Sequence, residues 1–233
     1  MPDLAADAGA ADAAPLRLVL ATRNTGKVRE LERLLAGVSV GGRAVVPVPV
    51  PADAPEVDED APTLAGNAAK KARALHAHTG LPALADDSGL FVPALGGAPG
   101  VRSARYAGDD ANDADNRAAL RLALDAFPDG APERRAYFET VIAYVDAAGT
   151  LHTFGGRCDG RIVREERGTG GFGYDALFVP NDGQTPGEPT LDEPERTFAE
   201  MPAEAKNAIS HRARALAAFV AWLPASDRPM VRR

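Results

Sequence analysis

Two adjacent carboxylates and a hydroxyl, Asp86, Asp87 and Ser88, lie between the apolar run Leu81–Ala85 and a glycine-rich stretch that ends at Gly100. Two like charges that lie close together need a cation or a proton to offset them. Carboxylate oxygens, combined with phosphate oxygens and water, are the usual ligands of magnesium in proteins. This group is therefore a candidate magnesium and phosphate site.

The position of these carboxylates in the fold has two interpretations. If Leu81–Ala85 is a buried strand, the carboxylates emerge at its C-terminal end, where open α/β sheets bind ligands. The alternative is an Asx turn that closes the strand, in which Gly89 supplies a positive φ and no chemistry is implied. The sequence of this stretch is compatible with both.

A second polar group, Thr22–Lys27, follows the apolar strand candidate Leu16–Ala21 and precedes a segment with helical periodicity. Free N–H groups at a helix N-terminus attract anions, and Lys27 adds a full positive charge. The alternative is an ordinary helix cap with a solvated lysine. A Walker P-loop is excluded, because Ala21 and Val28 stand where that motif needs Gly and Ser or Thr.

The segment 52–62 is rich in acidic residues and proline and predicts a loop. Its carboxylates predict either a solvated charge run or a second metal ligand, and they are Glu56, Asp58, Glu59 and Asp60. The next segment predicts a helix that begins after the N-cap Thr63, runs to about His78 and is stopped by Gly80. We interpret Lys70, Lys71 and Arg73, on the flanks of this helix, as solvated residues.

The glycine-rich stretch Gly168–Gly173 precedes Tyr174 and Asp175. Several glycines let a backbone approach a ligand closely, and the rings of Phe172 and Tyr174 could stack on a base. A glycine turn with core aromatics is the alternative interpretation.

The last helix is predicted from about Ala203 to Leu223, with Lys206, His211 and Arg212 near its start. Lys206 and Arg212 are six residues apart, so a regular helix would place them on different faces. Either the helix begins late or a ligand meets its end. Adjacent helical side chains do not face one another, so Ser210 and His211 form no hydrolase dyad.

The remaining elements predict a mixed sheet. Two long strands joined by a tight turn indicate an antiparallel pair, so we expect the sheet to be mixed. Prolines in a further apolar segment restrict it to a sheet edge or an interrupted strand. The expected elements are the antiparallel strands Tyr137–Ala147 and Leu151–Val163, the edge strand Val45–Val50, the strand Ala176–Pro180 and a helix over Asp113–Phe127.

Composition limits the class of protein. The chain has 233 residues, of which 45% are hydrophobic and 25% charged, and a net charge of −7. These values predict a soluble globular protein with a large core and no basic surface for nucleic acid or an anionic membrane. A single cysteine, Cys158, excludes an internal disulfide and suits a reducing compartment.

Domain organisation is expected to be simple. The Ala- and Asp-rich residues 1–14 predict a disordered tail that is not a secretory signal, because it has no basic or apolar region. Residues 15–224 are expected to form one domain, followed by a C-terminal tail at 225–233. The segment Asn181–Pro194 predicts a mobile loop, because it is rich in Gly, Pro, Asp and Glu.

Six blocks, taken together and in order, resemble those of the Ham1-like inosine/xanthosine triphosphate pyrophosphatases, and the resemblance extends from residue 16 to 223. The blocks are Thr22–Lys27, Ala85–Gly89, Leu95–Gly100, Ser103–Tyr106, Gly170–Asp175 and Lys206–Arg212. Each block alone is weak, but their order and family-like spacing argue against chance. The resemblance implies an α/β fold: an elongated mixed β-sheet flanked by helices, in two lobes with a central cleft.

The resemblance also implies an activity. Members of this family use Mg²⁺ to hydrolyse ITP, dITP and XTP to the monophosphate and pyrophosphate, which removes deaminated purine nucleotides before they enter DNA or RNA. A cytoplasmic homodimer is the expected form. The competing hypotheses are a Maf-type or other nucleotide phosphohydrolase with a different base preference, and a nucleotide-binding module without activity.

Roles carried across by the resemblance divide the candidate residues into four groups. The catalytic residues would be Asp87, as the base, and Lys27. The metal would be held by Asp87, by Glu59 with Glu56 as its rival, and by Asp86, directly or through water. The triphosphate would be bound by the loop residues Thr22, Arg23, Asn24, Thr25, Gly26 and Lys27, and Ser88 would contact the substrate. The base would be stacked by Phe172, enclosed by Gly173, Tyr174 and Asp175, and read by Lys206, His211 and Arg212.

This chain departs from the family pattern at several positions. Arg23 replaces a common Gly, and we expect it to add a phosphate contact. Gly66 replaces a Glu and would remove half of a capping box. Ala205 replaces the Glu before Lys206, and the loop at 181–194 is longer than in most relatives.

Overall fold

The computed structural model describes residues 14–40, 42–182 and 195–226. Its strands are β1 (Leu16–Leu20), β2 (Ser39–Val40), β3 (Arg43–Val48), β4 (Ala83–Phe91), β5 (Pro99–Gly100), β6 (Arg135–Val145), β7 (Leu151–Ile162) and β8 (Phe178–Pro180). Its helices are α1 (Thr25–Leu35), α2 (Leu64–Thr79), α3 (Asp113–Ala123), α4 (Ala203–Ile209) and α5 (His211–Ser226). The predicted tails and the loop at 181–194 lie wholly or largely outside the described residues.

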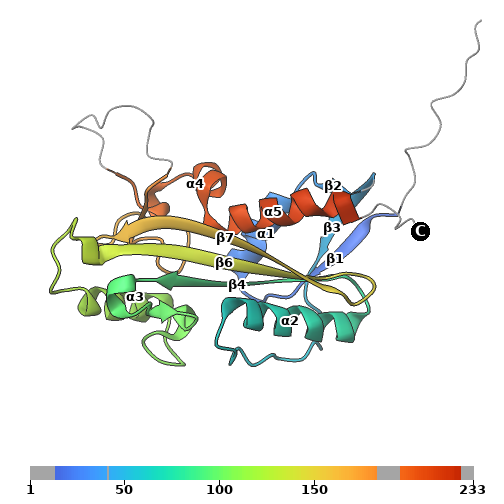
Figure 1. The fold of residues 1–233 in the computed structure, drawn as a ribbon, viewed down its shortest axis with the longest axis horizontal. Coiled ribbons are helices and arrows are strands. Elements are labelled where there is room, and N and C mark those ends of the chain that lie inside the picture. The colour runs from blue at the N-terminus through green and yellow to red at the C-terminus, as the bar shows by residue number, and fades with distance from the viewer. Residues whose placement is uncertain (1–13, 41, 183–194, 227–233) are drawn as a thin grey trace, which may run out of the picture.

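One mixed sheet runs through the molecule in the order β2-β3-β1-β4-β6-β7-β8, with β5 paired to β4. β1 pairs in parallel with β3 and β4, whereas β4, β6, β7 and β8 are antiparallel neighbours. Figure 1 shows α2 and α3 on one side of the elongated sheet and α1, α4 and α5 on the other. The expected α/β fold with a mixed, helix-flanked sheet is confirmed.

Local signals set several elements where the sequence predicts them. The N-cap of α2 is Thr63, whose Oγ1 accepts a hydrogen bond from the Gly66 N–H (3.1 Å). This is the half of the capping box that does not need a side chain at position 66. Gly80 ends α2 in the left-handed conformation (φ 66°). In the turn between β6 and β7, Asp146 Oδ1 accepts from the N–H groups of Ala148 and Thr150 (both 2.9 Å).

Helix α3 is shorter than predicted, ending at Ala123 instead of Phe127. The buried guanidinium of Arg134 donates to the carbonyl oxygens of Leu124 (2.9 Å) and Phe127 (2.8 Å). These carbonyls are therefore satisfied by a side chain, and a turn replaces the last part of the predicted helix.

The predicted C-terminal helix is two helices, because the chain leaves the helical conformation at Ser210 (φ −66°, ψ 154°). Beyond this break, α5 packs tightly on β7. A Cβ on Gly156 would lie 2.2 Å from the carbonyl oxygen of His211 and 2.4 Å from the backbone nitrogen of Ala215. The break lets α5 follow the sheet while α4 takes another direction.

Three apolar clusters make up the core. One lies between β1, α1 and α5 and includes Leu18, Leu31 and Phe219. A second packs α2 on the other face of the sheet. The third fills the far end around Phe138 and Phe178. We call the part of the molecule around the first two clusters one lobe and the part around the third cluster the other lobe. No helix within the described ranges is long and apolar enough to cross a membrane.

Candidate active site

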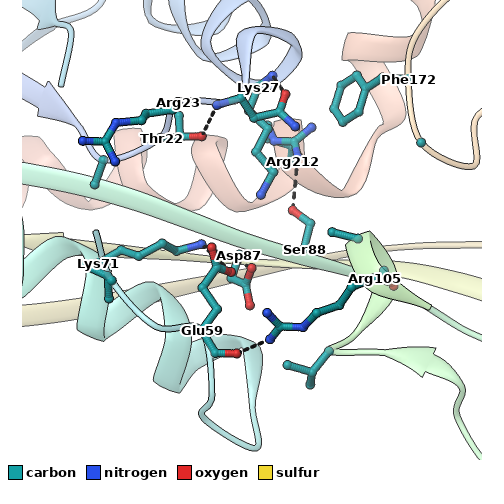
Figure 2. A pocket seen from close by; sticks show the side chains of 18 of the residues that line it. Thr22, Arg23, Lys27, Glu59, Lys71, Asp87, Ser88, Arg105, Phe172 and Arg212 are labelled. Atoms are coloured by element: carbon teal, nitrogen blue, oxygen red, sulfur yellow. Dashed lines mark hydrogen bonds and ion pairs between the residues drawn. The ribbon is translucent and has the colours of Figure 1, made fainter. Parts of the chain in front are cut away.

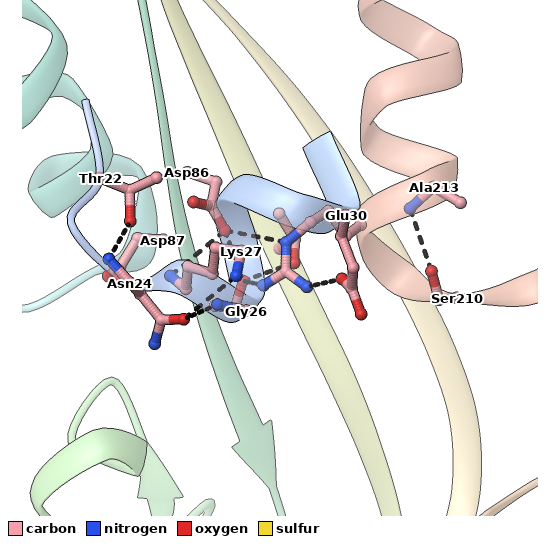
Figure 3. Close-up of polar contacts among 12 residues, drawn as sticks. Thr22, Asn24, Gly26, Lys27, Glu30, Asp86, Asp87, Ser210 and Ala213 are labelled. Carbon is pink, nitrogen blue, oxygen red and sulfur yellow. Dashed lines mark hydrogen bonds and ion pairs between the residues drawn. The ribbon is translucent and has the colours of Figure 1, made fainter. Parts of the chain in front are cut away.

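Asn24 shapes the loop between β1 and α1. Its side chain caps α1, with Oδ1 accepting hydrogen bonds from the N–H groups of Gly26 (2.9 Å) and Lys27 (3.1 Å). Thr22 Oγ1 in turn accepts from the Asn24 N–H (3.2 Å), as Figure 3 shows. The cap therefore uses two N–H groups that the sequence analysis expects to be free for an anion. Lys27 brings its positive charge to the same loop.

The strand that carries the two aspartates does not end before them. β4 runs on to Phe91 and pairs with β6 along its length, so Asp86 and Asp87 lie inside the strand. Both the expected strand end at Ala85 and the Asx-turn alternative are wrong. Gly89 does not adopt the expected positive φ. It allows β5 to approach closely, because a Cβ there would lie 2.4 Å from the carbonyl oxygen of Gly100.

Asp86 belongs to a buried ion cluster. Successive side chains of a strand point to opposite faces of a sheet, and Asp86 faces α1 and α5. Its Oδ2 lies 3.2 Å from Lys27 Nζ and 3.1 Å from Arg212 Nε (Figure 3). Burial alone would raise the pKa of Asp86, but the two cations hold this pKa well below its usual range. Asp86 is therefore ionised and neutralised by basic side chains.

Asp87 faces α2 and has a different environment. Its Oδ2 accepts a hydrogen bond from Asn67 Nδ2 (3.2 Å), and its Oδ1 lies 3.3 Å from Lys71 Nζ. The same ammonium lies 3.1 Å from Glu59 Oε2, so Lys71 bridges two carboxylates. Burial raises the pKa of Asp87, and so does the negative charge of Glu59. Lys71 and Lys27 lower it by less, so the pKa of Asp87 lies above its ordinary value. Asp87 is thus the more basic of the two adjacent aspartates.

The two rival acidic residues lie in different places. Glu56 has a 96% exposed side chain and lies 4.0 Å from Arg23, whereas Glu59 shares Lys71 with Asp87. The structure directs Arg23 toward this acidic loop, since its guanidinium also donates to the carbonyl oxygen of residue 54 (2.8 Å).

The carboxylates fit a magnesium ion that arrives with a ligand. Among residues 14–40, 42–182 and 195–226, no three His, Cys, Asp or Glu side chains form a ready metal site. Magnesium is often held by one or two carboxylates together with phosphate oxygens and water. Asp87 and Glu59 supply such a pair, because they already converge on one cation, the ammonium of Lys71. Asp86 faces away from them, toward Arg212 and Lys27.

The break at Ser210 brings two distant cations to one carboxylate. Lys206 Nζ lies 2.8 Å from Glu30 Oε1 and 2.7 Å from Asp175 Oδ2, while Arg212 Nη1 bonds to Glu30 Oε2. Burial would lower the pKa of Lys206, but Asp175 and Glu30 raise it. A continuous helix would separate Lys206 and Arg212, so the two-helix arrangement is what places them together.

Phe172 lies next to this cluster. Its ring centroid is 5.1 Å from Lys206 Nζ and 5.6 Å from Arg212 Cζ. A Cβ on Gly26 would lie 2.8 Å from the ring, so this glycine lets the ring rest against the loop before α1. Figure 2 shows Phe172, Lys27 and Arg212 on one side of the cavity and Lys71, Asp87, Glu59 and Arg105 on the other.

His211 borders the same cavity as a neutral ring. It stacks on Phe138 with ring centroids 4.6 Å apart, and burial together with the nearby charge of Arg212 lowers its pKa well below the usual range. Its Nδ1 is buried and has no hydrogen-bond partner among the described residues. That nitrogen is available to a ligand or a water molecule.

These groups surround a cavity of about 520 Å³ between the two lobes. Most of the predicted residues line it: Thr22, Arg23, Asn24, Lys27, Glu59, Asp87, Ser88, Phe172, Gly173, Tyr174, Asp175, Lys206, His211 and Arg212. Glu56, the rival of Glu59, also lines it, whereas Thr25, Gly26 and Asp86 lie outside the lining. A volume of this size is typical of a small-molecule site, and its lining combines cations, carboxylates and an aromatic ring.

The sequence analysis missed several charged neighbours of the cavity. Lys71, interpreted as solvated, bridges Asp87 and Glu59, and Glu30 joins the two cations of the C-terminal helices. Helical spacing could have found both residues. Lys71 lies four residues after Asn67, which also contacts Asp87, and Glu30 lies three residues after Lys27.

Comparisons with known proteins identify relatives of this chain. The chain is 48% identical over 201 residues to a dITP/XTP pyrophosphatase of Geobacter sulfurreducens, covering 86% of this chain and 93% of the relative. It is 48% identical over 209 residues to a dITP/XTP pyrophosphatase of Symbiobacterium thermophilum, covering 90% and 95%.

Solved structures are similar over the same extent. A HAM1 protein from Coxiella burnetii superimposes with a TM-score of 0.74 at 38% identity, covering 89% of this chain and 98% of that one. A nucleoside-triphosphatase / dITP/XTP pyrophosphatase from Mycobacterium abscessus gives a TM-score of 0.65 at 40% identity, covering 87% and 98%. The model of the Ham1 family matches residues 18–222, and with these similarities this chain belongs to the Ham1 family.

Proposed function

We propose that this chain is a magnesium-dependent nucleoside triphosphate pyrophosphohydrolase that converts dITP, ITP and XTP to the monophosphate and pyrophosphate. One observation carries the proposal: the pair Asp87 and Glu59, bridged by Lys71, faces Lys27 and Arg212 across a single cavity. The names of the relatives, dITP/XTP pyrophosphatase, support the same activity.

The triphosphate would lie between the loop before α1 and the side chains of α2. Lys27 and Lys71 approach the cavity from these two sides and would neutralise phosphate charge. Phosphoryl transfer needs such neutralisation and in-line positioning more than covalent chemistry. Their opposed positions would hold the α-phosphate between them.

Asp87 would orient the attacking water and accept its proton as the bond between the α-phosphorus and the leaving pyrophosphate breaks. Its burial beside Glu59 raises its pKa, which makes it a better base than an ordinary aspartate. Asp87 and Glu59 would also hold the metal. When bound, magnesium neutralises the phosphates and orients them for in-line attack.

Base selectivity would come from hydrogen-bond donors of the protein that pair with the 6-oxo group of the purine. An ammonium has three donors and a guanidinium five, so the carboxylate contacts of Lys206 and Arg212 still leave donors for a ligand. A 6-oxo purine accepts such a hydrogen bond, whereas adenine presents another donor. Guanine keeps the 6-oxo group, so its rejection would depend on its 2-amino group, which hypoxanthine and xanthine lack. Buried donors left unpaired can discriminate by ~10⁴–10⁵-fold.

The same proposal covers the biological setting. The enzyme would act in the cytoplasm as a homodimer, through one domain at residues 15–224, and would clear deaminated purine nucleotides before they reach DNA or RNA. Support comes from the six sequence blocks shared with the family. Sedimentation of the full chain would test the dimer separately from activity.

Product analysis with four substrates tests the activity. Purified protein is incubated with ITP, XTP, ATP or GTP, with magnesium or with EDTA, and both pyrophosphate and orthophosphate are measured. Pyrophosphate release from ITP and XTP, dependent on magnesium and weak with ATP and GTP, is expected. Orthophosphate as the product would contradict the proposed reaction, and equal rates on all four would contradict the proposed base selectivity.

A further inference from the structure

Helix α3 contacts the backbone of the loop that carries Phe172. Asp113 Oδ2 accepts a hydrogen bond from the Gly173 N–H (2.7 Å), and Arg117 Nη1 donates to the Gly173 carbonyl oxygen (3.0 Å). Asp113 and Arg117 are four residues apart, so they lie on one face of α3. Together they hold both backbone groups of one glycine.

Glycine at this position makes such support necessary. Gly173 has a φ of 61°, in the left-handed region, and no heavy atom lies within 4 Å of where its Cβ would be. A glycine in open space has large conformational freedom and no side chain to pack. The two hydrogen bonds from α3 therefore restrict a position that its own residue type leaves free.

The support itself is rigid. Asn112 and Asp115 form a capping box at the start of α3. The buried Asn116 then donates to the Ala104 carbonyl oxygen (3.0 Å) and accepts from the Ala107 N–H (2.9 Å). These bonds hold α3 against the segment 103–107, so the side chains of α3 that contact Gly173 start from a fixed backbone.

The loop receives contacts from both sides of the sheet. On the α3 side, the buried Tyr174 hydroxyl donates to the Ser103 carbonyl oxygen (2.8 Å). On the other side, the Phe172 ring faces Lys206 of α4, and the Phe172 N–H donates to Asp175 Oδ2 (2.9 Å), which also binds Lys206. Moving Gly173 would therefore move the ring relative to the cations of α4 and α5.

From this geometry we propose that Asp113 and Arg117 are positioning residues, which fix the Gly173 backbone so that Phe172 stacks on the purine at the right height for Lys206 and Arg212. The inference rests on the proposed function, because it assumes a purine nucleotide in the cavity. Neither residue would touch the reacting phosphates.

Kinetics with a base-free competitor tests this role. Asp113→Ala should raise KM for ITP about tenfold, the factor for one lost charge-assisted hydrogen bond, and change kcat by less than about threefold. Inhibition by inorganic tripolyphosphate, which has no base, should be unchanged. Asp113→Asn keeps an acceptor oxygen and should restore most of the affinity.

The second residue gives an independent variant. Arg117→Ala should raise KM less than Asp113→Ala, since the bond from Arg117 to Gly173 is the longer of the two (3.0 Å against 2.7 Å). The double variant should raise KM by more than either single variant, but by less than the product of the two single fold-changes, because both residues restrain one glycine. Matched controls are Asp109→Ala, whose partner is Arg102, and Arg121→Ala on α3, whose partners are residues 164 and 165.

Binding of IMP to the metal-free protein separates failure of this inference from failure of the proposed function. If the wild type releases no pyrophosphate from ITP, the function is wrong, and loss of IMP affinity in Asp113→Ala still supports the positioning role. If the wild type is active but Asp113→Ala keeps its KM and IMP affinity, the positioning role is overturned. Equal weakening of tripolyphosphate inhibition would also overturn it, because the variant would then disturb the whole site and not only the binding of the base.

Discussion

Asp86 and Asp87 are adjacent in the sequence but lie in two different electrostatic regions. On the α1 and α5 face, Asp86 is neutralised by Lys27 and Arg212. On the α2 face, Asp87 shares the single ammonium of Lys71 with a second carboxylate. The pKa of Asp86 is lowered and that of Asp87 is raised, although both are buried.

The difference shows how strand alternation divides structural and chemical work. A carboxylate with full neutralisation stays ionised and holds other side chains in place. A carboxylate whose pKa is raised by burial and a like charge can exchange protons near its working range. Here one peptide bond separates the two roles, because neighbouring strand residues face opposite sides of the sheet.

The largest expected effect is on stability, at Asp86. Asp86→Ala leaves Lys27 and Arg212 as buried cations without their shared partner, which should cost about 3–5 kcal/mol of unfolding free energy. Urea unfolding of the purified variant measures this loss. A change below about 1 kcal/mol would mean that Asp86 is not the partner on which the cations depend.

The second effect is on turnover, at Asp87. Asp87→Asn should reduce kcat for ITP by at least ~10²-fold, the range for one acid–base role. Its unfolding free energy at neutral pH should be unchanged or higher, since the variant removes a buried charge beside Glu59. Near-normal turnover would remove Asp87 from the mechanism.

The two positions should also give opposite pH dependences of stability. Asp86 has a pKa below its ordinary value of 3.8 in the folded state, so the deficit of Asp86→Ala is present above pH 3.8 and fades as the pH falls through the folded pKa. Asp87 has a raised pKa, so any stability gain of Asp87→Asn appears above that pKa and vanishes below pH 3.8. Urea midpoints between pH 2 and 7 measure both, because the Asp86 deficit should begin to shrink below pH 3.8 and the Asp87 gain should grow above it. Parallel curves would contradict the division.

The smallest expected effect is on base binding, at Gly26. Gly26→Ala puts a Cβ 2.8 Å from the Phe172 ring, and the ring is the side that can move. KM for ITP should rise severalfold, while inhibition by tripolyphosphate should change less. Gly155→Ala on β7 serves as a control of the glycine change, since nothing lies within 4 Å of its Cβ position and its φ is not in the left-handed region. An unchanged KM would show that the ring tolerates displacement.

Elements set by local chemistry could be predicted from the sequence. Thr63 and Gly80 mark the ends of α2 through a cap and a left-handed residue, and the tight turn predicts the β6–β7 hairpin. The family blocks brought together residues that line one cavity. The cap and turn signals involve residues close in the sequence, so they can be recognised without knowing the contacts made by the rest of the chain.

Features that depend on partners far along the chain could not be predicted. Whether β4 ends at Ala85 is decided by pairing with β6, which begins at Arg135. After the break at Ser210, α5 packs closely against Gly156 of β7, a contact between distant parts of the chain. The role of Lys71 depends on two carboxylates that only the folded chain brings together. Periodicity contains none of these contacts.

The division between Asp86 and Asp87 is tested most directly by titrating their side-chain carboxyl carbons by NMR in the metal-free protein. The structure predicts that Asp86 titrates below 3.8 and Asp87 above it. Asp87→Asn should remove the higher transition and leave the lower one. Two values on the same side of 3.8, or the higher value at Asp86, would contradict the assignment of Asp87 as the base.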